Sequence, residues 1–385
     1  MARSGSTSRT GLSAGTDRRL GPEGAVAPTP VTQRTAATQR VVRRRRRRRR
    51  RLAVTLTVTT ALVVTVVALG ADAGRILGPR RGSPPEGTQR GTGVAVKSTA
   101  PTTTSRGPSP PFTVASLTLP LVDTSRSVTV DGTTGPRQLP TTVWYPSNAA
   151  GERPLVVFAT GFLQCAAQYE PMLAAWAADG FVVAAPTFPL TNCAVPGGAN
   201  ENDELNQPAD VSFVTRQLLA ASADGTLAGG KLRGRIDPQE IALAGQSDGG
   251  NTVAAVAFNT AYTGIPVRAT LVLSGEMLSS FGGSWFPPGS PPMLVVQGTA
   301  DTVNLPAESQ QLYNADTTGP KAMVMLDGAT HLEPYEGSNP IEQLVVQITE
   351  DFLDQYVLDQ PGAAAALARD GNRPGVDTLT DSPGP

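Results

Sequence analysis

The sequence contains few of the side chains that bind transition metals. It has one histidine, His331, and two cysteines, Cys165 and Cys193, in 385 residues. A zinc site takes three or four protein ligands, most of them imidazole nitrogens or thiolate sulfurs. This composition leaves too few such ligands, so we predict no metal site and no cofactor.

Basic residues are scarce over most of the chain, although its formal net charge is +0. Residues 1–111 hold 21 of the 32 lysines and arginines but only 4 of the 32 acidic residues, which leaves 11 basic and 28 acidic residues after position 111. An acidic surface repels nucleic-acid phosphates and anionic lipid headgroups. We therefore expect no nucleic-acid partner for this part of the chain.

The basic excess of the N-terminal part lies beside an apolar run. Positions 43–51 are nine consecutive arginines, and the next 20 residues, 52–71, carry no charge. A run of that length suffices to cross a bilayer as a helix, and arginine-rich flanks stay in the cytoplasm. We expect a single-pass anchor in the cell membrane, with a cytoplasmic N-terminus and the rest of the chain outside.

A second interpretation of the apolar run is a cleaved signal sequence. The small residues Ala71 and Ala73 resemble a cleavage site, after which the protein would be secreted. The long segment ahead of the run favours the uncleaved anchor. Composition around it predicts a disordered basic arm over 1–51, a flexible linker over 72–111 and a disordered tail over 361–385.

Residues 112–360 alternate between strand-like apolar runs and helical stretches. This alternation predicts an α/β domain with a mostly parallel central sheet and helices on both faces, and the length suffices for one well-buried core. No insertion is long enough for a helical cap domain. The expected strands are 141–145, 154–159, 181–185, 240–244, 269–274, 292–297 and 321–326, with an antiparallel edge strand at 114–119, and the expected helices are 166–178, 208–222, 249–260, 305–314 and 340–356.

The most informative motif is a G-x-S-x-G pattern around Ser247. An apolar run leads into Gly245, Ser247 and Gly249, and a helical stretch follows. A strand, a sharp turn and a helix in this order form a nucleophile elbow, in which the strained turn needs small residues beside the serine. The other interpretation is an ordinary glycine-rich turn between a strand and a helix.

Residues that could activate this serine follow it in the chain. Asp301 and His331 each come shortly after an expected strand. A serine hydroxyl becomes a nucleophile when an imidazole accepts its proton, and a carboxylate on the far side of the ring fixes the tautomer. We predict a triad of Ser247, His331 and Asp301, with Glu276, at the end of another expected strand, as the rival acid.

The charge that develops on the substrate oxygen in such a reaction needs two fixed donors. One is expected to be the backbone N–H of Asp248, the residue after the serine. The other is expected to be that of Phe162, in the loop after the strand at 154–159. Read alone, Gly161 and Phe162 fit a plain strand-to-loop turn equally well.

Together, these motifs resemble the α/β-hydrolases, in particular the branch of dienelactone-hydrolase-like enzymes, cutinases and platelet-activating-factor-acetylhydrolase-like enzymes. The resemblance covers about residues 112–356 and rests on the elbow, the loop at 160–162 and the segments that contain Asp301 and His331. It implies the α/β-hydrolase fold without a large cap domain. Relatives usually carry histidine where this chain has Thr160 and Gln246.

The two cysteines suit an exported domain. Cys165 follows the loop with Phe162, and Cys193 follows the strand at 181–185. The carboxyl ends of parallel strands share one edge of a sheet, so the two loops can meet. Pairing is the default for cysteines outside the cytoplasm, and two buried free thiols are the alternative.

The combined prediction is a membrane-anchored, extracytoplasmic serine hydrolase that cleaves carboxylic esters through an acyl-enzyme intermediate. Its partners would be a small-molecule, lipid or polymer ester and the membrane itself. The aromatic segment 279–288 either lines an apolar substrate pocket or packs against the core. The alternative function is a binding or scaffolding protein that has lost catalysis, which the departures at Thr160 and Gln246 favour.

Overall fold

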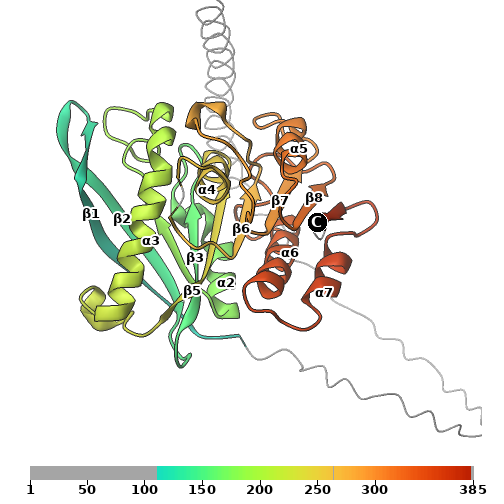
Figure 1. The fold of residues 1–385 in the computed structure, drawn as a ribbon, viewed down its shortest axis with the longest axis horizontal. Helices are drawn as coiled ribbons and strands as arrows, with labels where there is room; N and C mark the ends of the chain where they lie inside the picture. Colours follow the sequence, from blue (N-terminus) through green and yellow to red (C-terminus); the bar gives the residue numbers. More distant parts are fainter. Residues whose placement is uncertain (1–110, 263, 383–385) are drawn as a thin grey trace, which may run out of the picture. The chain divides into compact units, whose positions relative to one another are not determined.

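A nine-stranded sheet runs through the part of the chain that the computed structural model describes, residues 111–262 and 264–382 (Figure 1). Its strand order is β1-β2-β4-β3-β5-β6-β7-β8-β9. The strands are β1 Val114–Val130, β2 Thr133–Pro146, β3 Arg153–Ala159, β4 Val182–Pro186, β5 Ile236–Gln246, β6 Ala269–Leu273, β7 Met293–Gly298, β8 Lys321–Leu326 and β9 Asp377–Ser382.

Six neighbouring strands run parallel to one another, in the sheet order β4, β3, β5, β6, β7 and β8. The strands at the two ends of the sheet are antiparallel. The helices are α2 Glu170–Asp179, α3 Gln207–Asp224, α4 Asp248–Phe258, α5 Pro306–Ala315, α6 Pro340–Tyr356 and α7 Ala363–Asp370, with short 3-10 helices η1 Ala166–Tyr169, η2 Glu201–Asn206, η3 Ala228–Gly230 and η4 Ser279–Phe281.

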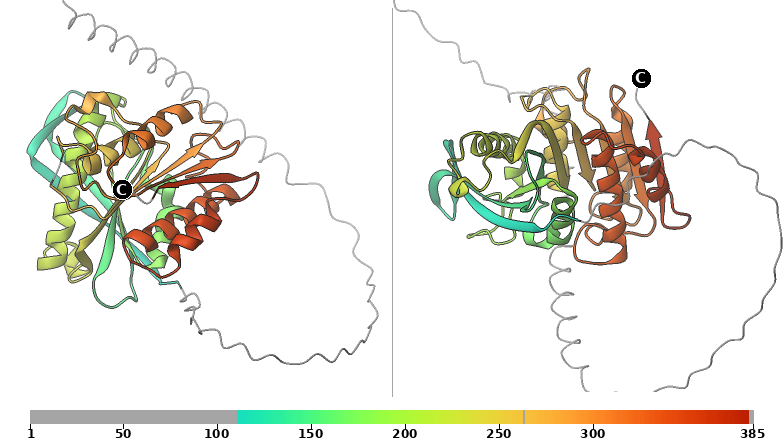
Figure 2. Two further views of the ribbon diagram at one scale, coloured as in Figure 1. Left: turned by 45° about the vertical axis from the view of Figure 1, so that its right-hand side comes forward. Right: turned by 90° about the horizontal axis from the view of Figure 1, so that it is seen from below.

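The helices cover both faces of the sheet. Side chains of α2, α6 and α7 belong to one apolar cluster, whereas those of α3, α4 and α5 belong to two other clusters. The two groups of helices lie on opposite faces of the sheet (Figure 2). The predicted α/β-hydrolase fold, with a mostly parallel sheet between two helix layers, is therefore confirmed.

Strand β3 shows why the expected strands were continuous apolar runs. Val156 and Phe158 pack with Trp176 of α2, whereas Leu155 and Val157 belong to the cluster of α3. Successive side chains of a strand point to opposite faces. A strand covered on both sides must therefore be apolar at every position, as parallel strands usually are.

The prediction of a disordered tail from residue 361 is wrong for residues 361–382. This segment forms α7 and β9, and β9 pairs antiparallel with β8 along its whole length. Leu367 of α7 is buried, and Leu379 of β9 packs against the same apolar cluster. The backbone of an edge strand pairs through its own N–H and C=O groups, so the polar composition of β9 did not reveal the pairing.

A long hairpin of β1 and β2 forms the opposite edge of the sheet. It turns at Asp131 and Gly132, which both have positive φ, 46° and 74°, as in a two-residue type I′ turn. The predicted edge strand, 114–119, is the first third of β1. The antiparallel edge is confirmed, and the hairpin extends well beyond it.

A buried group of charges joins this hairpin to the segment that follows β4. The guanidinium of Arg137, on β2, is 2% exposed and bonds both carboxylate oxygens of Asp203, on η2, at 2.9 and 2.8 Å. It also bonds both oxygens of Asp210, on α3, at 2.8 and 2.5 Å. Arg126 of β1 donates to Asp210 as well. These bonds hold η2 and α3 against the sheet edge.

Residues 1–110 lie outside the described residues. They include the basic arm, the apolar run at 52–71 and all of the expected linker except residue 111. What the sequence predicts for them stays a prediction. Among the residues that the structure describes, no helix combines the length and apolarity needed to span a membrane.

Candidate active site

Ser247 lies at a sharp turn between β5 and α4. Strand β5 ends at Gln246 and helix α4 begins at Asp248, so one residue makes the whole connection. Its φ and ψ are 57° and −122°. A residue with a side chain adopts such positive-φ angles only at a cost in strain. The geometry is that of the predicted nucleophile elbow.

The two glycines of the motif allow this turn to form. A Cβ atom on Gly245 would collide with the carbonyl group of Gly249, and a Cβ on Gly249 would collide with the carbonyl of Ala159 in β3. Both clashes involve backbone atoms, which cannot move aside. The spacing of glycine around Ser247 is thus explained by close approach of the turn to itself and to β3.

The three residues of the predicted triad lie in one hydrogen-bonded chain. His331 Nε2 is 3.0 Å from Ser247 Oγ, and His331 Nδ1 is 2.7 Å from Asp301 Oδ2. The residues come from the loops after β5, β7 and β8. Because these strands are parallel, their carboxyl ends share one edge of the sheet.

Asp301 is held by several donors besides the histidine. It is 2% exposed, its Oδ1 accepts the N–H groups of Val303 and Asn304, and its Oδ2 accepts Gln297 Nε2 at 3.1 Å. Burial by itself raises the pKa of a carboxyl group, but the bond and charge of His331, together with these donors, bring the pKa of Asp301 below its usual value. Asp301 is therefore ionised at neutral pH.

The rival acid, Glu276, lies beyond the end of β6. Its backbone N–H donates to Asn251 Oδ1 at 2.6 Å, one turn into α4. The imidazole bond goes to Asp301 instead. Of the two acids that the sequence left open, the structure brings Asp301 to the histidine.

Both expected oxyanion donors belong to segments at Ser247. Asp248 is the first residue of α4, where backbone N–H groups have no partner within the helix. The loop that carries Phe162 lies against the elbow, because a Cβ on Gly161 would be only 3.3 Å from Ser247 Cβ. Leu163, which follows Phe162, has φ 63° and donates its backbone N–H to Thr191 O at 2.7 Å.

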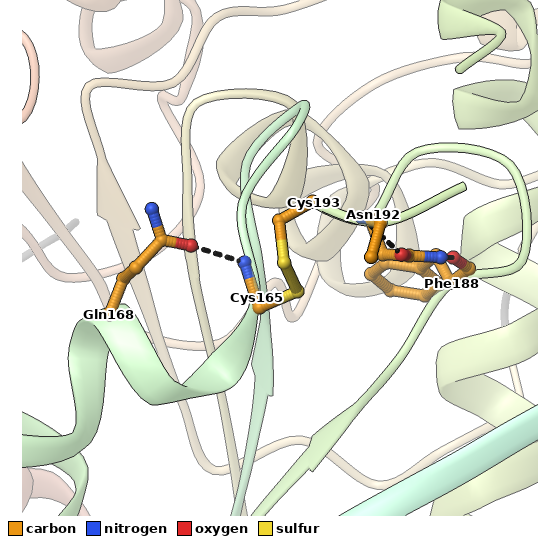
Figure 3. Close-up of a disulfide and its surroundings, with 6 residues drawn as sticks. Cys165, Gln168, Phe188, Asn192 and Cys193 are labelled. Atoms are coloured by element: carbon orange, nitrogen blue, oxygen red, sulfur yellow. Dashed lines mark hydrogen bonds between the residues drawn. A yellow bond between two sulfur atoms is a disulfide. The ribbon is translucent and has the colours of Figure 1, made fainter. Parts of the chain in front are cut away.

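Cys165 and Cys193 form the predicted disulfide, with 5.3 Å between their Cα atoms (Figure 3). The bond joins the loop after β3 to the loop after β4. Cys165 also donates its N–H to Gln168 Oε1 at 2.6 Å. A closed loop of 28 residues stabilises a folded domain by roughly 3.6 kcal/mol in the chain-entropy model. The bridge restrains the loop that carries Phe162.

The aromatic segment after β6 packs against the core rather than beside Ser247. The rings of Phe286 and Phe258 are 5.2 Å apart, and those of Phe281 and Tyr262 are 5.7 Å apart. Phe258 ends α4, whose 11 residues extend about 16 Å. The segment therefore contacts the end of α4 that is remote from Ser247.

Three buried residues around the triad had no role assigned from the sequence, although Gln246 had been noted as a departure from the histidine of relatives. Gln297, near the end of β7, holds Asp301, whereas Gln246 and Tyr169 lie behind His331. A polar residue within an apolar strand run was the available signal for both glutamines. Tyr169 carried no signal, because its partner is 77 residues away in the sequence.

The described part of the chain contains no cluster of three or more histidine, cysteine or acidic side chains arranged to hold a metal ion. The arrangement of Ser247, His331 and Asp301 has the geometry of a hydroxyl nucleophile with a base and an orienting acid.

Comparison with known proteins agrees with this geometry. Residues 121–274 match the model of the family described as Chlorophyllase. The matched segment includes the loop after β3 and the elbow with Ser247, and it ends before Asp301 and His331. No curated protein matches the chain. The chain therefore has the α/β-hydrolase fold, and the matched family is related to dienelactone-hydrolase-like and platelet-activating-factor-acetylhydrolase-like enzymes. The match indicates an ester hydrolase of the serine type.

Proposed function

We propose that the chain hydrolyses carboxylic esters through an acyl-enzyme intermediate on Ser247. One observation carries the proposal: the hydrogen-bonded chain from Ser247 Oγ through His331 to Asp301, at 3.0 and 2.7 Å. A serine, a base and an orienting acid in contact are the elements of nucleophilic acyl transfer.

In the first half of the reaction, Ser247 Oγ attacks the ester carbonyl carbon and transfers its proton to His331 Nε2. The imidazolium is stabilised by the ionised carboxylate of Asp301, which accepts the Nδ1 proton in a hydrogen bond. The tetrahedral intermediate then loses the alcohol, which takes the proton from Nε2. Ser247 is left as an acyl ester.

In the second half, water attacks the acyl carbon and gives a proton to the same nitrogen. Collapse of the second intermediate returns that proton to Ser247 and releases the carboxylic acid. In both halves the backbone N–H groups of Phe162 and Asp248 would bind the oxyanion, which is worth about 3–4 kcal/mol for each donor in comparable enzymes.

The surface around the site supports an ester with an apolar part. Leu163, Leu205 and Leu305 are 36%, 41% and 40% exposed. Leu163 and Leu305 lie in the loops after β3 and β7, and Leu205 lies in η2, in the segment after β4. All three segments follow strands whose carboxyl ends are at the sheet edge where Ser247 lies. Exposed leucines on segments that follow strands at one edge of the sheet favour binding of an apolar acyl or alcohol chain.

Covalent labelling with alkyl fluorophosphonates tests this function on the purified chain. We expect one adduct, on Ser247, and faster labelling by an octyl than by an ethyl probe. Ser247→Ala should abolish the adduct, whereas Ser280→Ala, an exposed serine of η4, should keep it. An unlabelled wild-type protein would leave the alternative, a hydrolase-fold binding or scaffolding protein.

The proposed location rests on the sequence. The arginines at 43–51 and the apolar run at 52–71 favour an anchor with the hydrolase domain outside the cytoplasm. A disulfide in that domain agrees with an oxidising compartment. A phosphatase reporter fused to the C-terminus should be active, since it works only outside the cytoplasm; a silent reporter would contradict the location.

A further inference from the structure

Gln246, the residue before the nucleophile, lies in a buried chain of hydrogen bonds that ends at His331. Gln246 is fully buried, as is Tyr169 of η1. The hydroxyl of Tyr169 donates to Gln246 Oε1 at 2.8 Å. On the other side, Gln246 Nε2 is 3.1 Å from the backbone oxygen of His331 and 3.3 Å from His331 Nε2.

The chain determines which way the amide of Gln246 points. A backbone carbonyl can only accept a hydrogen bond, so the atom of Gln246 that faces His331 O must be the NH₂ group. The amide oxygen then faces Tyr169. The N–H of Gly161 is directed at the oxygen of Tyr169, at 3.4 Å, which leaves the hydroxyl hydrogen for Gln246.

The phenol of Tyr169 stays protonated and therefore stays a donor. Burial raises its pKa well above the ordinary value, and the carboxylates of Glu336 and Asp248 raise it further. A neutral hydroxyl that donates to Oε1 stabilises the orientation in which the NH₂ group faces the histidine.

This orientation has a consequence for the tautomer of His331. Its Nδ1 faces the carboxylate of Asp301, which only accepts. Its Nε2 faces the NH₂ of Gln246, which only donates, and the hydroxyl of Ser247, which can donate or accept. A proton on Nε2 would meet the hydrogens of the NH₂ group. The surroundings thus favour a proton on Nδ1 and a lone pair on Nε2, which is the form that accepts the serine proton.

We infer that Gln246 and Tyr169 are positioning residues that keep His331 Nε2 unprotonated in the resting enzyme and so extend activity toward lower pH. The inference rests on the proposed function. The amide hydrogens oppose a second positive hydrogen on the ring, while the bond to His331 O holds the loop at its distance from Ser247.

A series of substitutions at position 246 separates this role from a structural one. Glutamine presents positive hydrogens to Nε2, methionine presents no dipole, and glutamate presents a negative charge. The labelling rate should fall as the pH is lowered, and the pH at which it is half-maximal is the midpoint of this acid limb. We expect the midpoint to be higher in Gln246→Met than in the wild type, and higher again in Gln246→Glu. Opposite charges at this separation shift a titration by about 1–3 pH units, which is the rise expected for Gln246→Glu.

The measurement is the second-order rate of fluorophosphonate labelling from pH 4.5 to 9. Tyr169→Phe removes one oxygen and should also raise the pH midpoint, by a smaller amount. This variant tests the inference if a position-246 variant does not fold. Other groups near the network are Asp301, Asp248, Tyr335 and Glu336, and burial raises the pKa of Glu336 to about 7. Glu336→Gln is therefore the control, and its midpoint should match that of the wild type.

Midpoints that rise from glutamine through methionine to glutamate support the inference. A uniform loss of rate at every pH, with an unchanged midpoint in folded Gln246→Met, Gln246→Glu and Tyr169→Phe, overturns it and leaves the proposed function standing. A midpoint that moves in Glu336→Gln instead assigns the limb to Glu336 and also overturns it. A wild-type protein that is never labelled removes the proposed function itself.

Discussion

Replacing Ser247 by alanine should lower the turnover of a short-chain nitrophenyl ester by roughly 10⁴–10⁶-fold. The substitution removes only the hydroxyl group, whose oxygen is 3.0 Å from His331 Nε2. Alanine tolerates the backbone angles of the elbow as poorly as serine does. The midpoint of unfolding should therefore stay close to the wild-type value. His331→Ala should lose activity to the same degree, because the chain has no second histidine. Asp301→Asn should lose about 10⁴-fold or somewhat less, since an amide supports the wrong tautomer.

Glu276→Gln is the matched control for the acid. It changes the rival carboxylate of the neighbouring strand end and should keep most of the activity. Steady-state kcat and KM at pH 8 check both results. A crippled Glu276→Gln beside a near-normal Asp301→Asn would show that the acid has been assigned to the wrong residue.

Replacing Arg137 by methionine should lower the free energy of unfolding by about 3–5 kcal/mol. Methionine is apolar and cannot bond the carboxylates of Asp203 and Asp210, which have side chains 3% and 0% exposed. Two buried negative charges would then lose their main partner, with Arg126 left beside Asp210 alone. Burial lowers the pKa of a guanidinium, yet the two aspartates hold the pKa of Arg137 above its ordinary value.

Arg268→Met is the control for this effect. Arg268 is 42% exposed and pairs with Glu240 at 3.0 Å, and exposed pairs are worth about 0–1 kcal/mol. Urea unfolding followed by circular dichroism measures both variants. A loss below about 1 kcal/mol in Arg137→Met would mean that water or a local shift replaces the lost bonds.

Local sequence was sufficient to predict the sharp turn at Ser247 and the strand and helix on either side of it. The apolar run into Gly245, the serine and the helix after Gly249 are contiguous, so the elbow is a short-range feature. The steric reason for the glycines is also mostly local, because Gly245 meets Gly249. The base could be named because there is one histidine, and its position after a strand placed it on the correct edge.

The sequence favoured Asp301 as the acid but left Glu276 as a rival. Both acids follow parallel strands that are neighbours in the sheet, β7 and β6. Either one therefore reaches the right edge, and strand order does not separate them. The loop after β7 decides, since Val303 and Asn304 turn their N–H groups onto Asp301 and direct its other oxygen at His331.

By itself, then, the sequence determined the sheet class, the elbow, the histidine that contacts Ser247 and the two cysteines that pair, because each follows from local pattern or from a count. Only the tertiary structure showed that Asp301 rather than Glu276 contacts His331, that β9 pairs with β8, and that a chain of hydrogen bonds runs from Tyr169 to His331. These depend on contacts between segments far apart in the sequence, such as the 77 residues between Tyr169 and Gln246. Hydrogen bonds between buried groups require positions within a few tenths of an ångström, and such positions are set when the helices and strands pack together.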